Sequence, residues 1–184
     1  YYDKAIRLNS SSYRAWRLWA LANASTVEMN EFIDVKNPVR LVVCAISGLF
    51  RSIELGSEEP NVSVLQDILR LLKLWNKYGE TDPAIGQALK TGTNSIPPQT
   101  WLEVIPQLIA RIKPPNDLVC QLLKGIGRYN PQPLLFPLTV ASSTLNQRSQ
   151  AAQKIMQYLQ ELHPVMVEEA RLVARELIRV AVLW

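Results

Sequence analysis

The residues able to carry out chemistry are few in this sequence and stand far apart. His163, the one histidine of the chain, lies between two predicted helices, where an N-cap or turn residue is expected. A catalytic triad would need a nucleophile and an acid beside that histidine, and the neighbouring residues indicate neither. Cys44 and Cys120, with a single histidine, cannot complete a tetrahedral zinc site unless carboxylates join them. We therefore predict no catalytic residue and no metal site.

Nucleotide-binding motifs are missing as well. The segment KGIGRY contains Gly125 and Gly127 but lacks a third glycine, and it lies late in a predicted helix rather than after a strand. The sequence has no Walker lysine motif and no metal-binding Asp-Phe-Gly. We therefore expect no cofactor within this segment.

Basic residues along the last predicted helix form a stripe with two interpretations. Arg171, Arg175 and Arg179 recur every four residues and could bind an anion or a partner. The stripe could equally be a solvated face, because Glu168 and Glu176 each stand three residues before an arginine and can pair with it. We favour the solvated face, which would lie opposite apolar residues that pack.

A second basic pair could serve a polyanion. Arg14 and Arg17 flank the tryptophans of the first long predicted helix. If they project into the concave surface of a helical repeat protein, basic residues from adjacent repeats could join them around a highly charged ligand.

The composition indicates a folded helical protein. The chain has 184 residues, of which 48% are hydrophobic, with 7 glycines and a net charge of +4. This mild charge predicts neither nucleic-acid nor membrane binding. No apolar run approaches the roughly 20 residues of a membrane span, and no secretory signal is present. The apolar surroundings of Cys44 and Cys120 predict buried, reduced thiols in a cytoplasmic or nuclear protein.

Apolar residues recur with helical spacing along nearly the whole chain, so we predict an all-α fold. Helices are expected at 1–7, at 12–29, between Asn37 and Gly56, between Ser63 and Gly79, and at 82–93, 98–112, 115–129, 131–143, 146–161 and 164–184. Helices of this length with short connections predict an α-solenoid of stacked helical hairpins.

Three regions are distinguished within this solenoid. Residues 1–36 carry a tetratricopeptide-like pattern, in which Trp16 and Trp19 fill the groove between helices. Residues 37–162 are interpreted as HEAT-like repeats, because LLKLWNKYG at 71–79 is similar to LLKGIGRYN at 122–130. Residues 163–184 are the final helix.

Four further residues are assigned structural roles. Trp75, Trp101 and Phe136 are expected to pack between helices. Pro106 stands inside the segment TWLEVIPQLIARI, where it predicts a bent helix, since proline removes a backbone hydrogen bond and crowds the preceding turn. The alternative is a break into two short helices. We favour the bend because apolar residues keep one face across the proline.

Together these segments resemble a known family. The segments that carry the resemblance are YRAWRLWALAN, GLFRSIELG, LQDILRLLKLWNKYG, TWLEVIPQLIARI, IGRYNPQPLLFPLTVAS and ARELIRVAVLW. In this order they resemble the target of rapamycin protein kinases, which belong to the phosphatidylinositol-3-kinase-related family. The similar region is the C-terminal part of the FAT domain, and it covers nearly the whole chain. The resemblance implies that a rapamycin-binding domain and then a kinase domain follow Trp184.

The resemblance also implies a function. The segment would be a non-catalytic scaffold that clamps and restrains the kinase domain of a serine/threonine kinase controlling growth in response to nutrients. The parent would use ATP and magnesium, contact its own kinase and rapamycin-binding domains, join regulatory subunits, and be cytoplasmic or peripheral on lysosomal or vacuolar membranes. Arg14 matches a lysine that in the family helps to hold inositol hexakisphosphate. Two alternatives stay open: an independent adaptor solenoid for a protein partner, and a module whose main role is to bind inositol hexakisphosphate.

Overall fold

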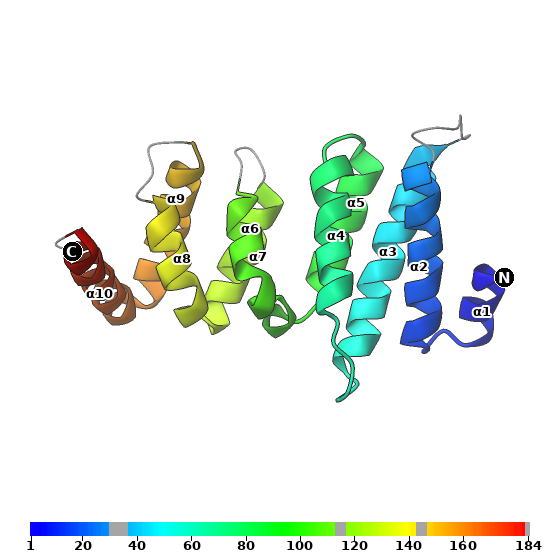
Figure 1. The fold of residues 1–184 in the computed structure, drawn as a ribbon, viewed down its shortest axis with the longest axis horizontal. Helices are drawn as coiled ribbons and strands as arrows, with labels where there is room; N and C mark the ends of the chain where they lie inside the picture. Colours follow the sequence, from blue (N-terminus) through cyan, green and yellow to red (C-terminus); the bar gives the residue numbers. More distant parts are fainter. Residues whose placement is uncertain (30–36, 113–116, 143–146, 183–184) are drawn as a thin grey trace. The chain divides into compact units, whose positions relative to one another are not determined.

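The chain is helical throughout the part that the structure describes. The computed structural model describes residues 1–29, 37–112, 117–142 and 147–182, and these ranges contain no strand. The helices are α1 (Tyr2–Leu8), α2 (Tyr13–Met29), α3 (Pro38–Ser57), α4 (Leu65–Tyr78), α5 (Pro83–Ser95), the 3₁₀ helix η2 (Pro98–Val104), α6 (Ile105–Ala110), α7 (Asp117–Tyr129), α8 (Gln132–Ser142), α9 (Gln147–Leu162) and α10 (Pro164–Val182). The predicted all-α fold is confirmed (Figure 1).

Two helices begin at caps of the same kind. The side chain of Asn37 accepts a hydrogen bond from the backbone N–H of Arg40, and Pro38 occupies the first turn, where a missing N–H costs nothing. Asp82 caps α5 in the same way, with its Oδ1 atom 2.8 Å from the nitrogen of Ala84. The predicted start at Asn37 is therefore confirmed.

Two of the expected helix boundaries are wrong. The residue preceding α4 is Val64, and no side chain caps this helix, so Ser63 is not its cap. Gly56 does not follow α3 but lies inside it, buried. A Cβ at Gly56 would come 2.8 Å from Val64 Cγ1, so this glycine is needed for close packing rather than for ending the helix.

The segment around Pro106 is broken rather than bent. Residues Pro98–Val104 form a 3₁₀ helix, and α6 starts at Ile105 with Pro106 in its first turn. The first N–H groups of an α-helix have no intrahelical partner, so a proline there loses no hydrogen bond. The bent helix that we favoured is thus wrong, and the alternative of two short helices holds.

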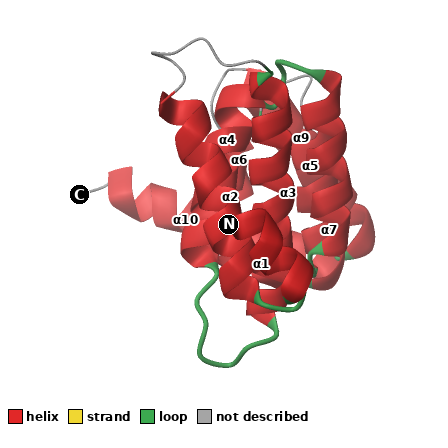
Figure 2. Cartoon of the chain, turned by 90° about the vertical axis from the view of Figure 1, so that its right-hand side faces the viewer, coloured by secondary structure: helices red, strands yellow, loops and turns green. Residues whose placement is uncertain are grey.

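The chain forms two compact units, Tyr1–Pro97 and Pro98–Trp184. In the first unit α3 packs against α2, α4 and α5, while α1 packs on α2. Figure 2 shows the helices coloured by structure class, without a strand in the described residues. Leu49 and Ile53 of α3, with Leu71 and Leu72 of α4, are fully buried and form the centre of this unit. Burial of such side chains stabilises each helix by about 1.5–3 kcal/mol per residue.

The second unit has a separate core. Here α9 packs against α7, α8 and α10, and η2 packs against α7. Trp101 of η2, Leu123 of α7, Leu138 of α8 and Leu159 of α9 are each 0% exposed. The division of the chain into tetratricopeptide-like, HEAT-like and final-helix regions stays a prediction.

Candidate interaction surfaces

The residues considered for catalysis or metal binding belong to different elements, with Cys44 on α3 and Cys120 on α7. His163 lies between α9 and α10, and its backbone N–H and carbonyl bond to Leu159 and Val167. Within the described residues no three His, Cys, Asp or Glu side chains gather where they could hold a metal ion. Cys44 and Cys120 are reduced thiols of intermediate burial, so the prediction that they are buried is wrong. Burial raises the pKa of Cys44, an effect that Arg40 opposes and Asp3 reinforces.

Arg14 lies on the surface of the first unit. Its Nε atom donates to the hydroxyl of Tyr13 at 3.3 Å, and its guanidinium carbon is 5.8 Å from the centre of the same ring. The hydrogen bond to Tyr13 raises the pKa of Arg14. The side chain is exposed, and its raised pKa keeps it charged. Binding of a polyanion would require both properties.

The two tryptophans of α2 pack on each other and on the chain before them. Trp16 and Trp19 meet edge to face, with ring centroids 5.7 Å apart. The indole N–H of Trp16 donates to the Ser10 carbonyl at 2.8 Å, and that of Trp19 donates to Asp3 at 2.9 Å. Trp19 thus links α2 to α1, and it also meets Gly48 of α3 closely enough to leave no room for a Cβ. These contacts support their assignment as structural residues.

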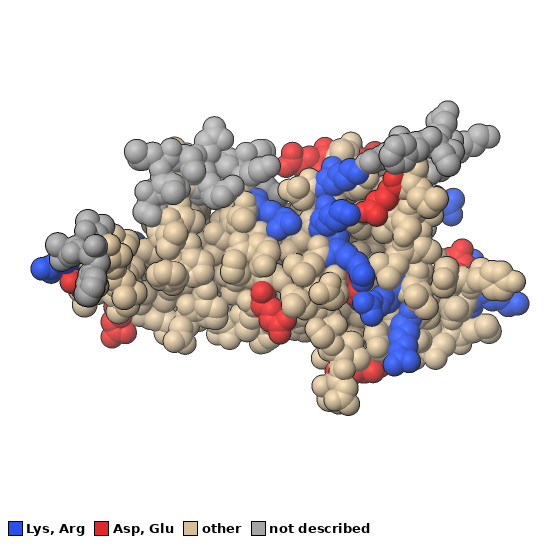
Figure 3. All heavy atoms as spheres, in the orientation of Figure 1, with Lys and Arg blue, Asp and Glu red and all other residues tan. Residues whose placement is uncertain are grey.

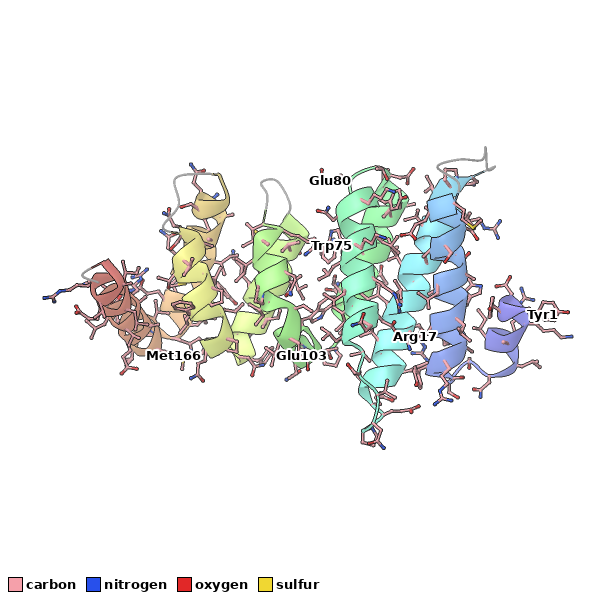
Figure 4. The ribbon with its side chains drawn as sticks, viewed as in Figure 1. Tyr1, Arg17, Trp75, Glu80, Glu103 and Met166 are labelled. Atoms are coloured by element: carbon pink, nitrogen blue, oxygen red, sulfur yellow. The ribbon has the colours of Figure 1, made fainter. Side chains whose placement is uncertain are left out.

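A buried carboxylate joins three helices of the first unit. Asp67 of α4 is 4% exposed, and its Oδ1 accepts from Arg17 Nε of α2 at 2.9 Å and from Arg70 at 3.3 Å. Its Oδ2 accepts from the hydroxyl of Ser52 in α3 at 3.0 Å. A buried charge is tolerated when it is paired and hydrogen-bonded in this way. Arg17 therefore holds helices together (Figure 4) rather than standing ready for a polyanion.

Sequence reasoning missed Asp67, although its signal was present. An aspartate stands in the leucine-rich stretch LQDILRLLKLW, three residues before Arg70. Further along α4, Lys73 pairs with Glu28 of α2 at 2.6 Å. Figure 3 shows lysine and arginine side chains following one another over α4 and toward α2. Arg17 and Arg70 share the single carboxylate of Asp67, so this cluster keeps a positive excess.

The remaining structural residues divide into buried and exposed. Trp75 is 6% exposed and Trp101 is 0% exposed, in agreement with their predicted packing. A Cβ at Gly79 would come 2.7 Å from the Trp75 ring and 2.6 Å from the Trp75 carbonyl oxygen, so a glycine is required where α4 ends. Phe136, in contrast, is 57% exposed on α8, so its predicted packing within these residues is wrong.

The final helix exposes the apolar stripe that we expected to pack. Met166, Val173, Leu177 and Val180 share one side of α10, and we call them the α10 apolar face. Met166 is 38% exposed and the other three are 55–57% exposed. Helix α10 packs against α8 and α9, and its buried side chains are instead Val167 and Ala174, which are 0% and 4% exposed. Exposed apolar patches of this kind mark interaction sites.

The geometry thus defines a helical-repeat protein with interaction surfaces rather than a catalytic centre in its described part. Comparison with known families agrees with this class. Residues 1–73 match the FAT domain, and residues 84–178 match the family described as serine/threonine-protein kinase ATR-like, HEAT repeats.

Comparison with curated relatives assigns the chain to a narrower family. It is 42% identical to serine/threonine-protein kinase tor1 of Schizosaccharomyces pombe, 40% identical to serine/threonine-protein kinase TOR of Arabidopsis thaliana and 39% identical to serine/threonine-protein kinase mTor of Drosophila melanogaster. Each match covers 100% of this chain and 8% of the relative, so the chain spans about a twelfth of their length. The chain belongs to the FAT and HEAT-repeat region of the target of rapamycin family.

No helix in the described ranges combines the length and apolar character needed to cross a bilayer.

Proposed function

We propose that this segment is a non-catalytic helical scaffold that docks on the kinase domain of a target of rapamycin-type serine/threonine kinase and restrains it. The observation that carries the proposal is the α10 apolar face. Three of its four side chains are more than half exposed, although the same helix buries Val167 and Ala174 against its own unit. Leaving such a stripe in water forgoes about 25 cal/mol for each Å² of apolar area, which docking would recover.

The family membership supports the identity of the covering part. Residues 1–73 match the FAT domain, and all three relatives above are by name serine/threonine kinases. We include in the proposal contacts with the rapamycin-binding domain and with regulatory subunits, and a parent that uses ATP and magnesium. The proposal further includes control of growth by nutrients and a cytoplasmic location, peripheral to lysosomal or vacuolar membranes.

The test uses the full-length parent with Val173→Gln and Leu177→Gln together. Both side chains are exposed, so the substitutions should leave the fold of this segment intact while weakening the docked contact. We expect higher basal phosphorylation of a protein substrate. Arg175→Gln, on the other side of α10, is the matched control. Unchanged basal activity in a double variant that melts like the wild type would argue against restraint through this face.

A second function rests on Arg14. We infer that Arg14 forms an edge of a site for inositol hexakisphosphate, because it is exposed and is bound to Tyr13 rather than to a carboxylate. Arg17 is unsuited to this role since it is bound to Asp67. Calorimetry with inositol hexakisphosphate should show weaker binding for Arg14→Ala and unchanged binding for Lys90→Ala, a control on α5 in the same unit. Equal binding by wild type and Arg14→Ala would remove Arg14 from the site.

A further inference from the structure

The second unit contains a cavity that the proposed scaffold role does not use. It has a volume of about 150 Å³ and is lined by Thr139 and Ser142 of α8, Gln153, Met156 and Gln157 of α9, and Arg171 of α10. Pockets for drug-sized ligands and cofactors measure about 300–1,000 Å³, so this one is too small for them. A cavity of this size suits one side chain of a bound peptide, as in the anchor pockets of protein interfaces.

The positive charge in this α8–α10 pocket comes from Arg171. Of the arginine stripe on α10, Arg171 turns furthest inward: its side chain is 37% exposed, compared with 68% for Arg179. The Nη1 atom of Arg171 lies 3.1 Å from Oε1 of Glu168, and Gln160 donates to the same oxygen at 2.7 Å. Glu168 therefore fixes the guanidinium in place, and because it is 61% exposed its charge is partly screened by water.

The opposite wall offers acceptors. The Thr139 hydroxyl donates to the Leu135 carbonyl at 2.7 Å, and the Ser142 hydroxyl donates to the Thr139 carbonyl at 2.8 Å. Each hydroxyl donates its proton to a backbone carbonyl, so its oxygen remains available only as an acceptor. The amide of Gln153 donates toward the Ser142 carbonyl and the Ser149 hydroxyl, at 3.5 and 3.4 Å, which ties the start of α9 to the end of α8.

We propose that the α8–α10 pocket binds one acidic side chain, an aspartate or glutamate presented by a peptide of a protein partner. The carboxylate pairs with Arg171, whose planar guanidinium matches it in two hydrogen bonds. The peptide N–H of the same residue donates to the hydroxyl oxygens of α8, and its methylene groups rest on Met156, which is 4% exposed. A singly charged carboxylate is favoured over a doubly charged phosphate, because one arginine already close to Glu168 cannot neutralise two further charges.

The test titrates the ¹⁵N-labelled chain with a blocked peptide, acetyl-Ala-Glu-Ala-amide, and follows the side-chain amide signals of Gln153 and Gln157. Saturable shifts at both are expected. The acetyl-Ala-Gln-Ala-amide peptide should bind about tenfold more weakly, as loss of a charge-assisted hydrogen bond predicts. An absence of saturable shifts, or equal binding of the two peptides, would overturn the proposal.

Two variants identify the cation and its neighbour. Arg171→Gln should weaken binding of the glutamate peptide about tenfold, whereas Arg175→Gln, an exposed arginine one turn later, should leave it unchanged. Glu168→Gln keeps the acceptor for Gln160 but removes a negative charge, so binding should tighten. Wild-type affinity in Arg171→Gln, weaker binding in Glu168→Gln, or a phosphoserine peptide that binds more tightly than the glutamate peptide would each refute the assignment.

Discussion

The Nε atom of Arg17 lies 2.9 Å from Oδ1 of Asp67, and this ion pair connects α2 to α4 across 50 residues of sequence. The arginine side chain is 37% exposed and the aspartate side chain is 6% exposed. Water therefore reaches one end of the pair while the carboxylate is covered, and Ser52 and Arg70 complete its hydrogen bonds. Residues of α2, α3 and α4 therefore all donate hydrogen bonds to the buried carboxylate of Asp67.

Asp67→Asn should destabilise the first unit. The amide keeps the shape of the carboxylate but removes the charge that Arg17 and Arg70 share, so we expect a loss of about 1–3 kcal/mol in the free energy of unfolding. Urea denaturation followed by circular dichroism measures it. Glu54→Gln is the matched control, because the Arg51–Glu54 pair lies on the surface of α3 and contributes about 0.3–0.5 kcal/mol. Equal midpoints for the two variants would show that the Asp67 cluster contributes little.

Two glycines of α5 should respond in opposite ways to alanine. A Cβ at Gly92 would overlap the Phe50 ring of α3, so Gly92→Ala must displace that ring or α5 and should cost about 1–3 kcal/mol. Gly86 has nothing within 4 Å of the same position, so Gly86→Ala should stabilise the helix by about 0.5–1 kcal/mol. Thermal melts of both variants test the pair. A destabilised Gly86→Ala protein would contradict the open space there.

Trp101→Ala should unfold much of the second unit. The side chain is 0% exposed, and truncating a buried tryptophan costs about 3–5 kcal/mol. Phe136→Ala removes a ring that is 57% exposed, so its effect should stay within about 0.5 kcal/mol. Chemical denaturation with tryptophan-independent detection compares them. A large loss from Phe136→Ala would restore the packing role that the sequence suggested for it.

The Cys44 thiol should react slowly with alkylating reagents. Burial raises its pKa above the ordinary value of 9.0, so less thiolate is present at a given pH in the folded chain than in the unfolded one. Because the folded state holds this proton to higher pH, stability should fall as pH rises past about 9. Arg40 opposes the shift, so Arg40→Ala should slow alkylation further. Mass spectrometry of the Cys120→Ser protein gives the rate, and a rate equal to that in urea would exclude the effect.

Much of the fold follows from apolar spacing, and the helix at Asn37–Pro38 follows from capping chemistry. The break at Pro106 could not be predicted from apolar spacing. Trp101, Ile105 and Leu108 would be buried either in one bent helix or in a 3₁₀ helix followed by an α-helix. Over so few residues, the apolar spacing of a 3₁₀ helix cannot be distinguished from that of an α-helix.

The interaction surfaces were harder to predict from the sequence than the helices. α8 is apolar on most sides, so the pattern cannot say that Leu135 packs while Phe136 faces solvent. On α10 the strongest apolar stripe was expected to be buried, yet the buried residues are Val167 and Ala174. An apolar stripe indicates that this face of the helix will be covered. Periodicity alone does not show whether the same unit or another part of the protein covers it. The pocket at Arg171 depends on three helices meeting, which no single segment encodes.

The packing of α3 on both α2 and α5 has a kinetic consequence. Helices that touch in the first unit either follow one another along the chain or are separated by a single helix. Contacts between near neighbours require only short loops to close, so the entropy lost before packing begins is small. Tyr1–Pro97 can accordingly assemble helix by helix as the chain emerges during synthesis, with α3 as the template on which its neighbours settle.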